Sequence, residues 1–355
     1  MDMNFKALSF FSISFVLMTV LFGGCVELIN FDIDRTGNRL VIDGMITNSP
    51  GPYTLKLRRT TEEEKISDPL SGAKITITDN LGNSEQYFET KDGVYKLGGY
   101  SVRGVPGRSY TIEIELPNGQ TYRSETEQMP TILARDSIYY EFDTITTVNS
   151  HGSRSETEVI RVIRNTSVPK TENPLYLKWE VQETYKFSEF DFPDPFHMPP
   201  PSCYVTEYPD PQAIHLYDGS ELASGQLAPM PIVEREIDYT FYQLHFINVI
   251  QYSMTRKGHE YWTQVDQVVN RSGTIFDIPP ANANSNISNI ENPDEVVLGY
   301  FHAAATDTTR FYLLPADLPI HISNPCSRFS TPDCQGGCST FDNSSKDPPY
   351  YWLQD

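Results

Sequence analysis

Runs in which apolar and polar residues alternate dominate residues 39–127, and they constrain the fold more than any other feature of the chain. Lys74-Ile-Thr-Ile-Thr78 is typical, and turn signals such as Asp79-Asn-Leu-Gly82 and Pro117-Asn-Gly119 separate the runs. A period of two turns one side of an extended strand toward a core and the other toward water. Because about seven such strands and their turns fit into about 90 residues, the pattern predicts a β-sandwich of the immunoglobulin or transthyretin type.

The second half of the chain is also predicted to be rich in strands. Residues 175–181 alternate, with one side formed by Leu175, Leu177, Trp179 and Val181 and the other by Tyr176, Lys178 and Glu180. A long strand is expected at 241–254 and a further strand at 295–301. One clear α-helix is predicted at about 255–271, because apolar residues recur there at helical spacing and Ser272-Gly273 follows.

The predicted fold class is therefore mainly β: an immunoglobulin/transthyretin-like sandwich, then a second β-rich domain that carries the helix. The expected parts are a lipoprotein signal peptide (1–24), a lipidated tether (25–38), the β-sandwich domain (39–128) and a C-terminal domain with disulfides (129–355). A mature chain of about 330 residues fits two domains of ordinary size.

The N-terminus resembles a bacterial lipoprotein signal. Lys6 precedes an apolar stretch that ends in Leu21-Phe-Gly-Gly-Cys25. This stretch is shorter than the roughly 20 residues that span a bilayer, and small residues before a cysteine are typical of a site where a lipoprotein signal peptidase cleaves. Phe22 is unusual at its position, and the alternative is an ordinary signal peptide with a chance cysteine. We expect a lipidated Cys25 that holds the body on a membrane.

The strong negative charge excludes some partners. The chain has a formal net charge of −20, and removal of residues 1–24 deletes one acid, Asp2, and one base, Lys6, so the mature charge is unchanged. Such a body repels nucleic acid and anionic lipid head groups. Nucleic acid is therefore not expected as a partner, and the membrane is expected to be reached only through the lipid.

Four cysteines remain after Cys25: Cys203, Cys326, Cys334 and Cys338. An even set in an exported chain predicts two disulfides, with three possible connectivities. We favour one bridge within 326–338 and one that ties Cys203 to that segment. A four-cysteine zinc site is the alternative, but an oxidising compartment and the absence of a two-residue knuckle spacing argue against it. No metal or cofactor is predicted.

Residues 185–211 form a segment rich in proline and aromatic residues. So many prolines exclude a central strand or a helix, and we predict a long structured loop pinned by the Cys203 disulfide. Its candidate binding residues are Phe187, Phe190, Phe192, Phe196 and Tyr204. They either stack on a ligand or partner protein or are buried where the loop folds onto its own domain.

No catalytic motif emerges from the sequence. Asp32 to Asp43 only partly matches a calcium loop, because Arg39 stands where an apolar residue is expected and no helices flank it. His259-Glu260 has no second histidine one turn on, so it is interpreted as a solvated pair on the helix. Serine-hydrolase elbows and phosphate loops are absent from the sequence. A paired-carboxylate glycosidase leaves no local signature, so an enzyme stays the alternative, and a non-enzymatic protein is expected.

Several motifs together resemble the domain-of-unknown-function family 4249 of Bacteroidota lipoproteins. They are the lipobox, Leu40-Val-Ile-Asp-Gly44, Pro69-Leu-Ser-Gly-Ala73, Asp92-Gly-Val-Tyr95, Gly107-Arg-Ser-Tyr110, Gln251-Tyr-Ser253, Tyr261-Trp262, Gly273-Thr-Ile-Phe-Asp277, Asn286-Ile287 and Glu295-Val-Val-Leu-Gly-Tyr-Phe301. Each motif is weak by itself, and their order carries the resemblance. The family has no established activity, so no functional residue is carried over.

The resemblance implies a place in the cell envelope, because members are often encoded beside TonB-dependent outer-membrane receptors. We therefore expect a lipid-anchored outer-membrane protein on the cell surface. Its expected role is that of a non-enzymatic accessory or ligand-capture subunit of a TonB-dependent nutrient transporter. The alternative function is a surface hydrolase that acts on glycans or peptides.

Overall fold

The computed structural model describes residues 38–60, 67–131, 134–148, 152–188, 202–220, 225–270, 283–323, 338, 341 and 343–352. The predicted signal peptide and Cys25 lie outside these residues. By internal contacts the chain from Asn38 to Asp355 forms one unit. In the part of the chain that the structure describes, no helix is long and apolar enough to cross a membrane.

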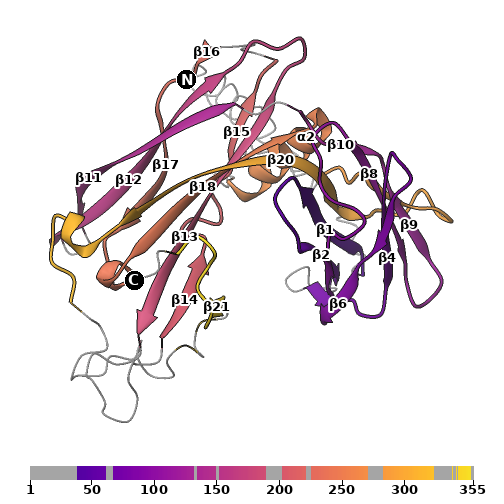
Figure 1. Ribbon diagram of the computed structural model, residues 1–355, viewed down its shortest axis with the longest axis horizontal. Coiled ribbons are helices and arrows are strands. Elements are labelled where there is room, and N and C mark those ends of the chain that lie inside the picture. Colours follow the sequence, from indigo (N-terminus) through magenta and orange to yellow (C-terminus); the bar gives the residue numbers. More distant parts are fainter. Residues whose placement is uncertain are drawn as a thin grey trace, which may run out of the picture. The chain divides into compact units, whose positions relative to one another are not determined.

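The described residues form three β-sheets and one α-helix, which confirms the mainly β fold class (Figure 1). The largest sheet has the order β21 (Ser344–Ser345), β14 (Ser202–Glu207), β13 (Tyr176–Ser188), β18 (His245–Met254), β20 (Leu298–Leu313), β1 (Leu40–Thr47), β2 (Tyr53–Thr60), β7 (Val94–Leu97) and β6 (Phe88–Lys91). Beside this path, β15 (His215–Asp218) pairs with β13, and β3 (Ser67–Pro69) pairs with β2.

Each of the two smaller sheets packs against a different part of the large sheet. One has the order β19 (Ile287–Asn289), β9 (Thr121–Ser124), β8 (Ser109–Glu115), β4 (Lys74–Asp79) and β5 (Ser84–Gln86), with β10 (Glu127–Gln128) paired to β8. The other has the order β11 (Arg135–Val148), β12 (Arg154–Val168) and β16 (Gly225–Gln226), with β17 (Met230–Glu236) paired to β12. The helix is α2 (Arg256–Val269), and two short 3₁₀ helices are η1 (Tyr239–Tyr242) and η2 (Pro315–Asp317).

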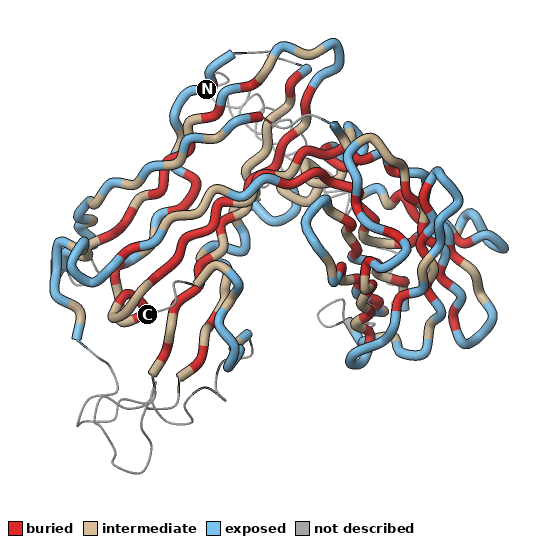
Figure 2. The backbone as a smooth tube through the Cα atoms, viewed as in Figure 1, coloured by how far each residue is buried: buried red, intermediate tan, exposed pale blue. Residues whose placement is uncertain are grey.

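The first core lies between strands of the large sheet and the β4–β8–β9 sheet, where period-two alternation predicted one. Leu40 and Ile42 from β1 meet Ile112 and Ile114 from β8 in one buried cluster. Figure 2 shows that buried residues follow the strands and exposed residues gather in the turns. Phe301 and Ile287 belong to the same cluster, so this core also draws on residues far beyond the predicted boundary at 128. The immunoglobulin or transthyretin type stays a prediction.

Strand β20 belongs to both halves of the large sheet. Its first part pairs in parallel with β1, from Val41↔Leu298 to Thr47↔Ala304, and its second part pairs antiparallel with β18. Gly299 permits the approach to β1, because its φ is +87° and a Cβ there would lie 1.9 Å from the Ile42 carbonyl oxygen. A residue with a side chain would clash with backbone at this point.

The second core lies between the β13–β18–β20 part of the large sheet and the β11–β12–β17 sheet. Leu177, Trp179, Ile160, Val162 and Val249 are among its buried members. The hairpin of β11 and β12, in register from Arg135↔Ser167 to Val148↔Arg154, was not predicted from the sequence. The sequence does contain the alternating apolar residues of this hairpin, since Ile138, Tyr140 and Phe142 pack against this core.

Three segments have boundaries that differ from the sequence-based prediction. The ends of segment 185–211 are not loop: residues up to Ser188 continue β13, and Ser202–Glu207 form β14 paired with it. The prolines that argued against a strand fall at 193–201, outside the described residues. The strand expected at 241–254 begins only at His245, after η1, and the strand expected at 295–301 begins at Leu298 and runs to Leu313.

Candidate ligand site under helix α2

Helix α2 begins and ends close to the predicted positions. The Thr255 side chain caps the N-terminus by accepting from the Gly258 backbone N–H at 3.1 Å, and Arg256 bonds to Glu260 one turn later at 2.8 Å. Capping of this kind satisfies a backbone donor that has no partner inside the helix. The Thr255 hydroxyl also donates to Glu127 Oε2 at 2.8 Å, which ties the start of the helix to β10.

The helix packs on the side of the large sheet that faces away from the two cores. On β13, Leu177 and Trp179 point into the second core, so the alternate residues Tyr176 and Lys178 face the helix. The Tyr176 ring lies 5.3 Å from His259, and Lys178 Nζ lies 4.1 Å from the centre of the Trp262 ring. The interpretation of His259 as a solvated residue is wrong, because the helix buries it against this strand.

Strand β20 contributes the aromatic floor of the site. Phe301 and Ala303 point into the first core, so Tyr300 and His302 lie on the helix side, with their rings 4.4 Å apart. Tyr261 of the helix packs on Tyr300 at 5.0 Å, and Trp262 stacks on His302 at 5.8 Å. Both faces of this part of β20 are therefore buried.

A cavity of about 390 Å³ opens between α2, β1 and β20. It is lined by Val41, Asp43, Tyr261, Trp262, Val265, Ala283, Leu298, Gly299, Tyr300 and His302. A smaller cavity of about 160 Å³ lies on the β13 and β15 side of Trp262, with Lys178, Glu180 and His215 in its wall. Trp262 and Val265 line both cavities.

Charge in the site is confined to a few groups. Lys178 is buried, with Nζ 3.4 Å from Glu180 Oε2 and 5.1 Å from the centre of the Tyr252 ring. Contacts with aromatic faces stabilise a buried ammonium. Burial, and then the nearby Lys178 charge, lower the pKa of His302 to about 3. His302 is therefore a neutral ring at physiological pH. Asp43 is exposed at the mouth of the larger cavity.

Three buried ring nitrogens in this site have no hydrogen-bond partner among the described residues: His302 Nδ1, Trp262 Nε1 and His259 Nε2. An unpartnered polar group in a protein interior is costly, and such groups are few in native structures. Two of these nitrogens belong to residues that line the cavities, Trp262 and His302.

A hydrogen-bonded cluster around Glu127 fixes the floor. Tyr300 donates to Glu127 Oε1 at 2.6 Å, and Asn286 donates to the same oxygen at 3.4 Å. Burial raises the pKa of Glu127 even though these bonds and the one from Thr255 act to lower it. The cluster joins β10, β20 and the start of the helix. The hydrogen bond from the Tyr300 hydroxyl to Glu127 therefore fixes the orientation of the Tyr300 ring.

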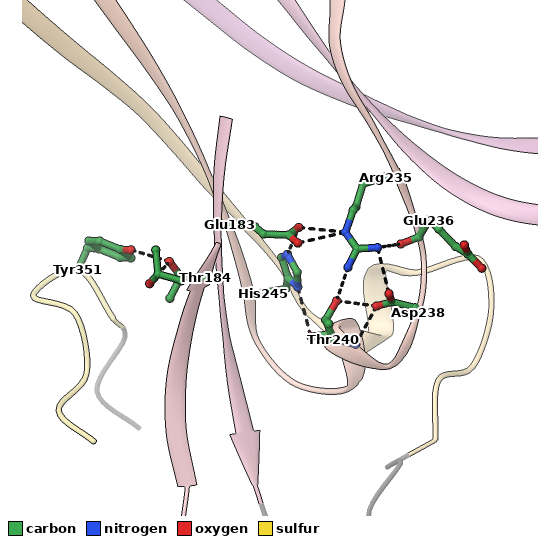
Figure 3. A network of polar contacts seen from close by, with 9 residues as sticks. Glu183, Thr184, Arg235, Glu236, Asp238, Thr240, His245 and Tyr351 are labelled. Atoms are coloured by element: carbon green, nitrogen blue, oxygen red, sulfur yellow. Dashed lines mark hydrogen bonds and ion pairs between the residues drawn. The ribbon is translucent and has the colours of Figure 1, made fainter. Parts of the chain in front are cut away.

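A second polar network lies at the far end of β13, and Figure 3 shows it from close by. The almost fully buried Glu183 carboxylate accepts hydrogen bonds from Arg235 Nε at 3.1 Å and from His245 Nε2 at 3.1 Å. Burial by itself raises the pKa of Glu183, but the hydrogen bond and charge of His245 and the charge of Arg235 outweigh it, so the pKa is lowered. Arg235 also bonds to Asp238 at 3.0 Å. The network ties β17 to β13 and β18 and is a structural feature.

Of the predicted disulfide set, Cys203 and Cys338 are joined, with an S–S distance of 2.10 Å. This ties Cys203 to the C-terminal segment, and the exact pairing could not be derived from the sequence. Cys326 and Cys334 lie outside the described residues, and their bridge stays a prediction. In the described part of the chain, no group of three or more His, Cys, Asp or Glu residues could hold a metal ion.

The predicted binding residues divide into two sets. Phe187 is buried beside the disulfide and packs on Phe341 at 5.0 Å, so its prediction as a ligand-stacking residue is wrong. Tyr204 is half-buried and packs on Trp352 at 4.8 Å. Phe190, Phe192, Phe196 and Cys25 lie outside the described residues.

Sequence reasoning missed the site under α2. Lys178 was assigned to the solvent side of its strand by alternation alone. A usable signal was the nearly uncharged run Leu298 to Ala305, because a strand buried on both faces is apolar throughout instead of alternating.

One family model matches the chain. It is described as a domain of unknown function, DUF4249, and it matches residues 26–310. No curated protein matches the chain. Because the match covers most of the sequence and includes β1, α2 and the greater part of β20, this chain belongs to the DUF4249 family.

Proposed function

We propose that this protein is a lipid-anchored, non-enzymatic subunit of the bacterial outer membrane that captures a ligand for a TonB-dependent transporter. The observation that carries the capture role is the aromatic cavity under α2, with unpartnered ring nitrogens of His302 and Trp262 beside it. Ligand sites are typically concave and largely apolar, with a few polar groups that fix orientation. The apolar N-terminal stretch, which ends in Leu21-Phe-Gly-Gly-Cys25, supports the lipid anchor, and the family membership supports a location in the cell envelope.

The chemistry of the cavity selects a class of ligand. Tyr261, Trp262 and Tyr300 line the cavity, and aromatic side chains in a ligand site favour a flat or ring-shaped molecule. Asp43 at the mouth and the net charge of −20 disfavour anions. We therefore propose a neutral or cationic ring compound, such as a sugar or an amino sugar, and not a carboxylate or phosphate.

Ligand capture is tested by titrating the purified protein with neutral sugars, amino sugars and sugar phosphates and recording Trp fluorescence and thermal shift. Trp262→Leu and Asp43→Asn should weaken binding of any hit at least tenfold. Glu113→Gln, which changes an exposed acid on β8, serves as the matched control and should bind like wild type. A hit that binds all three variants equally would contradict this site.

The transporter role and the anchor are tested in cells of the native host. Cys25→Ala should leave the chain unprocessed or release it from membranes, since the acyl chains are lost. A tagged wild-type protein extracted in mild detergent should co-purify with a TonB-dependent receptor. A pull-down without any outer-membrane receptor above background contradicts the partner, and unchanged membrane fractionation of the cysteine variant contradicts the anchor.

A further inference from the structure

Strand β11 is the outermost strand of its sheet (Figure 1). It pairs with β12 over its whole length, from Arg135 to Val148, without a register shift. Among the described residues no strand pairs with its other edge. Natural edge strands are usually protected by charged side chains, especially lysine, or by proline, a bulge, shortness or a covering segment. The sequence Arg135-Asp-Ser-Ile-Tyr-Tyr-Glu-Phe-Asp-Thr-Ile-Thr-Thr-Val148 contains no proline and no lysine.

The direction of the free backbone groups follows from β12. The carbonyls of Glu158 and Thr166 accept bonds from Ile237 and Leu227, on the side of β12 away from β11. Their partners across the hairpin, Thr144 and Asp136, are therefore non-hydrogen-bonded pairs and turn their N–H and C=O groups to the free edge. Even-numbered residues of β11 consequently present a row of donors and acceptors at this edge, although the Thr144 N–H already donates to Asp143 Oδ1 at 2.8 Å.

The side chains of the even-numbered residues are incompletely covered. Ile138, Tyr140 and Phe142 pack against the second core but remain half-buried, and Tyr140 stacks on Phe311 of β20 at 5.3 Å. A further strand at this edge would extend the apolar row and complete their burial.

We propose that the occupant of this edge is β11 of a second copy, paired antiparallel about a two-fold axis at Tyr139. In that register Ile138 faces the partner copy's Tyr140, and Arg135 faces the partner copy's Asp143. Each arginine then also has the partner copy's Glu141 as a diagonal neighbour. Opposite charges across an antiparallel pair are favourable, and shifting the axis to Tyr140 would place Arg135 opposite Ile145 instead. The interface is isologous, as in most dimers.

A single cysteine tests the register. Tyr139 would form a non-hydrogen-bonded pair with its own copy, with Cα atoms about 4.5 Å apart, a distance that a disulfide spans. Full-length Tyr139→Cys in mild detergent should form a covalent dimer on oxidation. Ser137→Cys is the matched control, because its two copies would lie about 14 Å apart along the strands and should not crosslink.

Charge exchange provides the second test. Asp143→Arg places two arginines opposite each other and should convert the dimer to monomer in analytical ultracentrifugation. The double variant Arg135→Asp/Asp143→Arg should restore the dimer. Asp143 also bonds to Arg161 at 2.8 Å, and the double variant does not restore that bond, so rescue identifies the contact between copies. A wild-type monomer at every concentration, equal crosslinking at 137 and 139, or the absence of rescue would overturn the proposal.

Discussion

Replacement of Glu183 by glutamine should destabilise the protein strongly, because this carboxylate is the buried acceptor for both Arg235 and His245. The side chains of Glu183 and Arg235 are 2% and 17% exposed, so solvent screens their interaction little. Removing one partner of a buried ion pair costs about 3–5 kcal/mol, since the other charge stays buried without compensation. For a chain of this size, that corresponds to a fall in Tm of roughly 4–7 °C.

Acid should reduce the difference between Glu183→Gln and wild type. The folded-state pKa of Glu183 is lowered below its ordinary value of 4.5. Its contribution to stability is therefore fully present above the unfolded-state pKa and is lost as the pH falls through the folded-state pKa. At neutral pH the contribution is complete, and below the folded-state pKa the two proteins should converge.

The assay is urea and thermal unfolding followed by circular dichroism, from pH 7 down to the acid limit of the folded state. Glu113→Gln is the control, because its pair with Arg123 is exposed on both sides and such pairs contribute under about 1 kcal/mol. Equal losses for the two variants at pH 7 would refute the reasoning, as would a Glu183→Gln deficit that does not shrink in acid.

Three further predictions concern other parts of the fold. Gly299→Ala should lower the free energy of unfolding in urea by at least about 4 kcal/mol, because the new Cβ would lie 1.9 Å from the Ile42 carbonyl oxygen. Gly82→Ala is the control: Gly82 has a similar φ of +84° but open space around it, so this change should cost only about 1–2 kcal/mol. Equal costs for the two variants would argue against the β1–β20 contact. Cys203→Ser should lower the free energy of unfolding by about 4–5 kcal/mol in the chain-entropy account, because the bridge joins residues 135 apart in sequence. Mass spectrometry of the wild-type protein without reduction should show the two linked peptides. A free Cys203 thiol in exported protein would contradict the bridge. His302 should stay neutral in an NMR titration down to about pH 3. Because its folded-state pKa lies below the unfolded value of 6.5, wild type should lose stability as the pH falls from 6.5 toward 3, and the stability of His302→Gln should depend less on pH over this range. Titration of His302 near pH 6.5 would contradict its burial.

Residue periodicity was sufficient to predict the helix and those strands of the first core that lie within residues 39–127. In β4, alternation named Ile75 and Ile77 as the inward residues, and both are fully buried. The helix prediction at 255–271 contained α2 because its apolar stripe and the Ser272-Gly273 that follows are local signals. Such features depend on neighbours within one strand or one helical turn, so the sequence alone carries them.

Only the tertiary structure decided what covers the second side of β13 and β20. Alternation identifies the apolar side of a strand, but it cannot show that a helix encoded some 80 residues later buries Lys178, or that Tyr300 and His302 form an aromatic floor beneath it. The same holds for contacts such as the bond from the Thr306 backbone N–H to Asn48, residues 258 apart. These contacts follow from chain topology, because β20 reaches both β1 and β18, and strand pairing over such separations has no local signature in the residues that it joins.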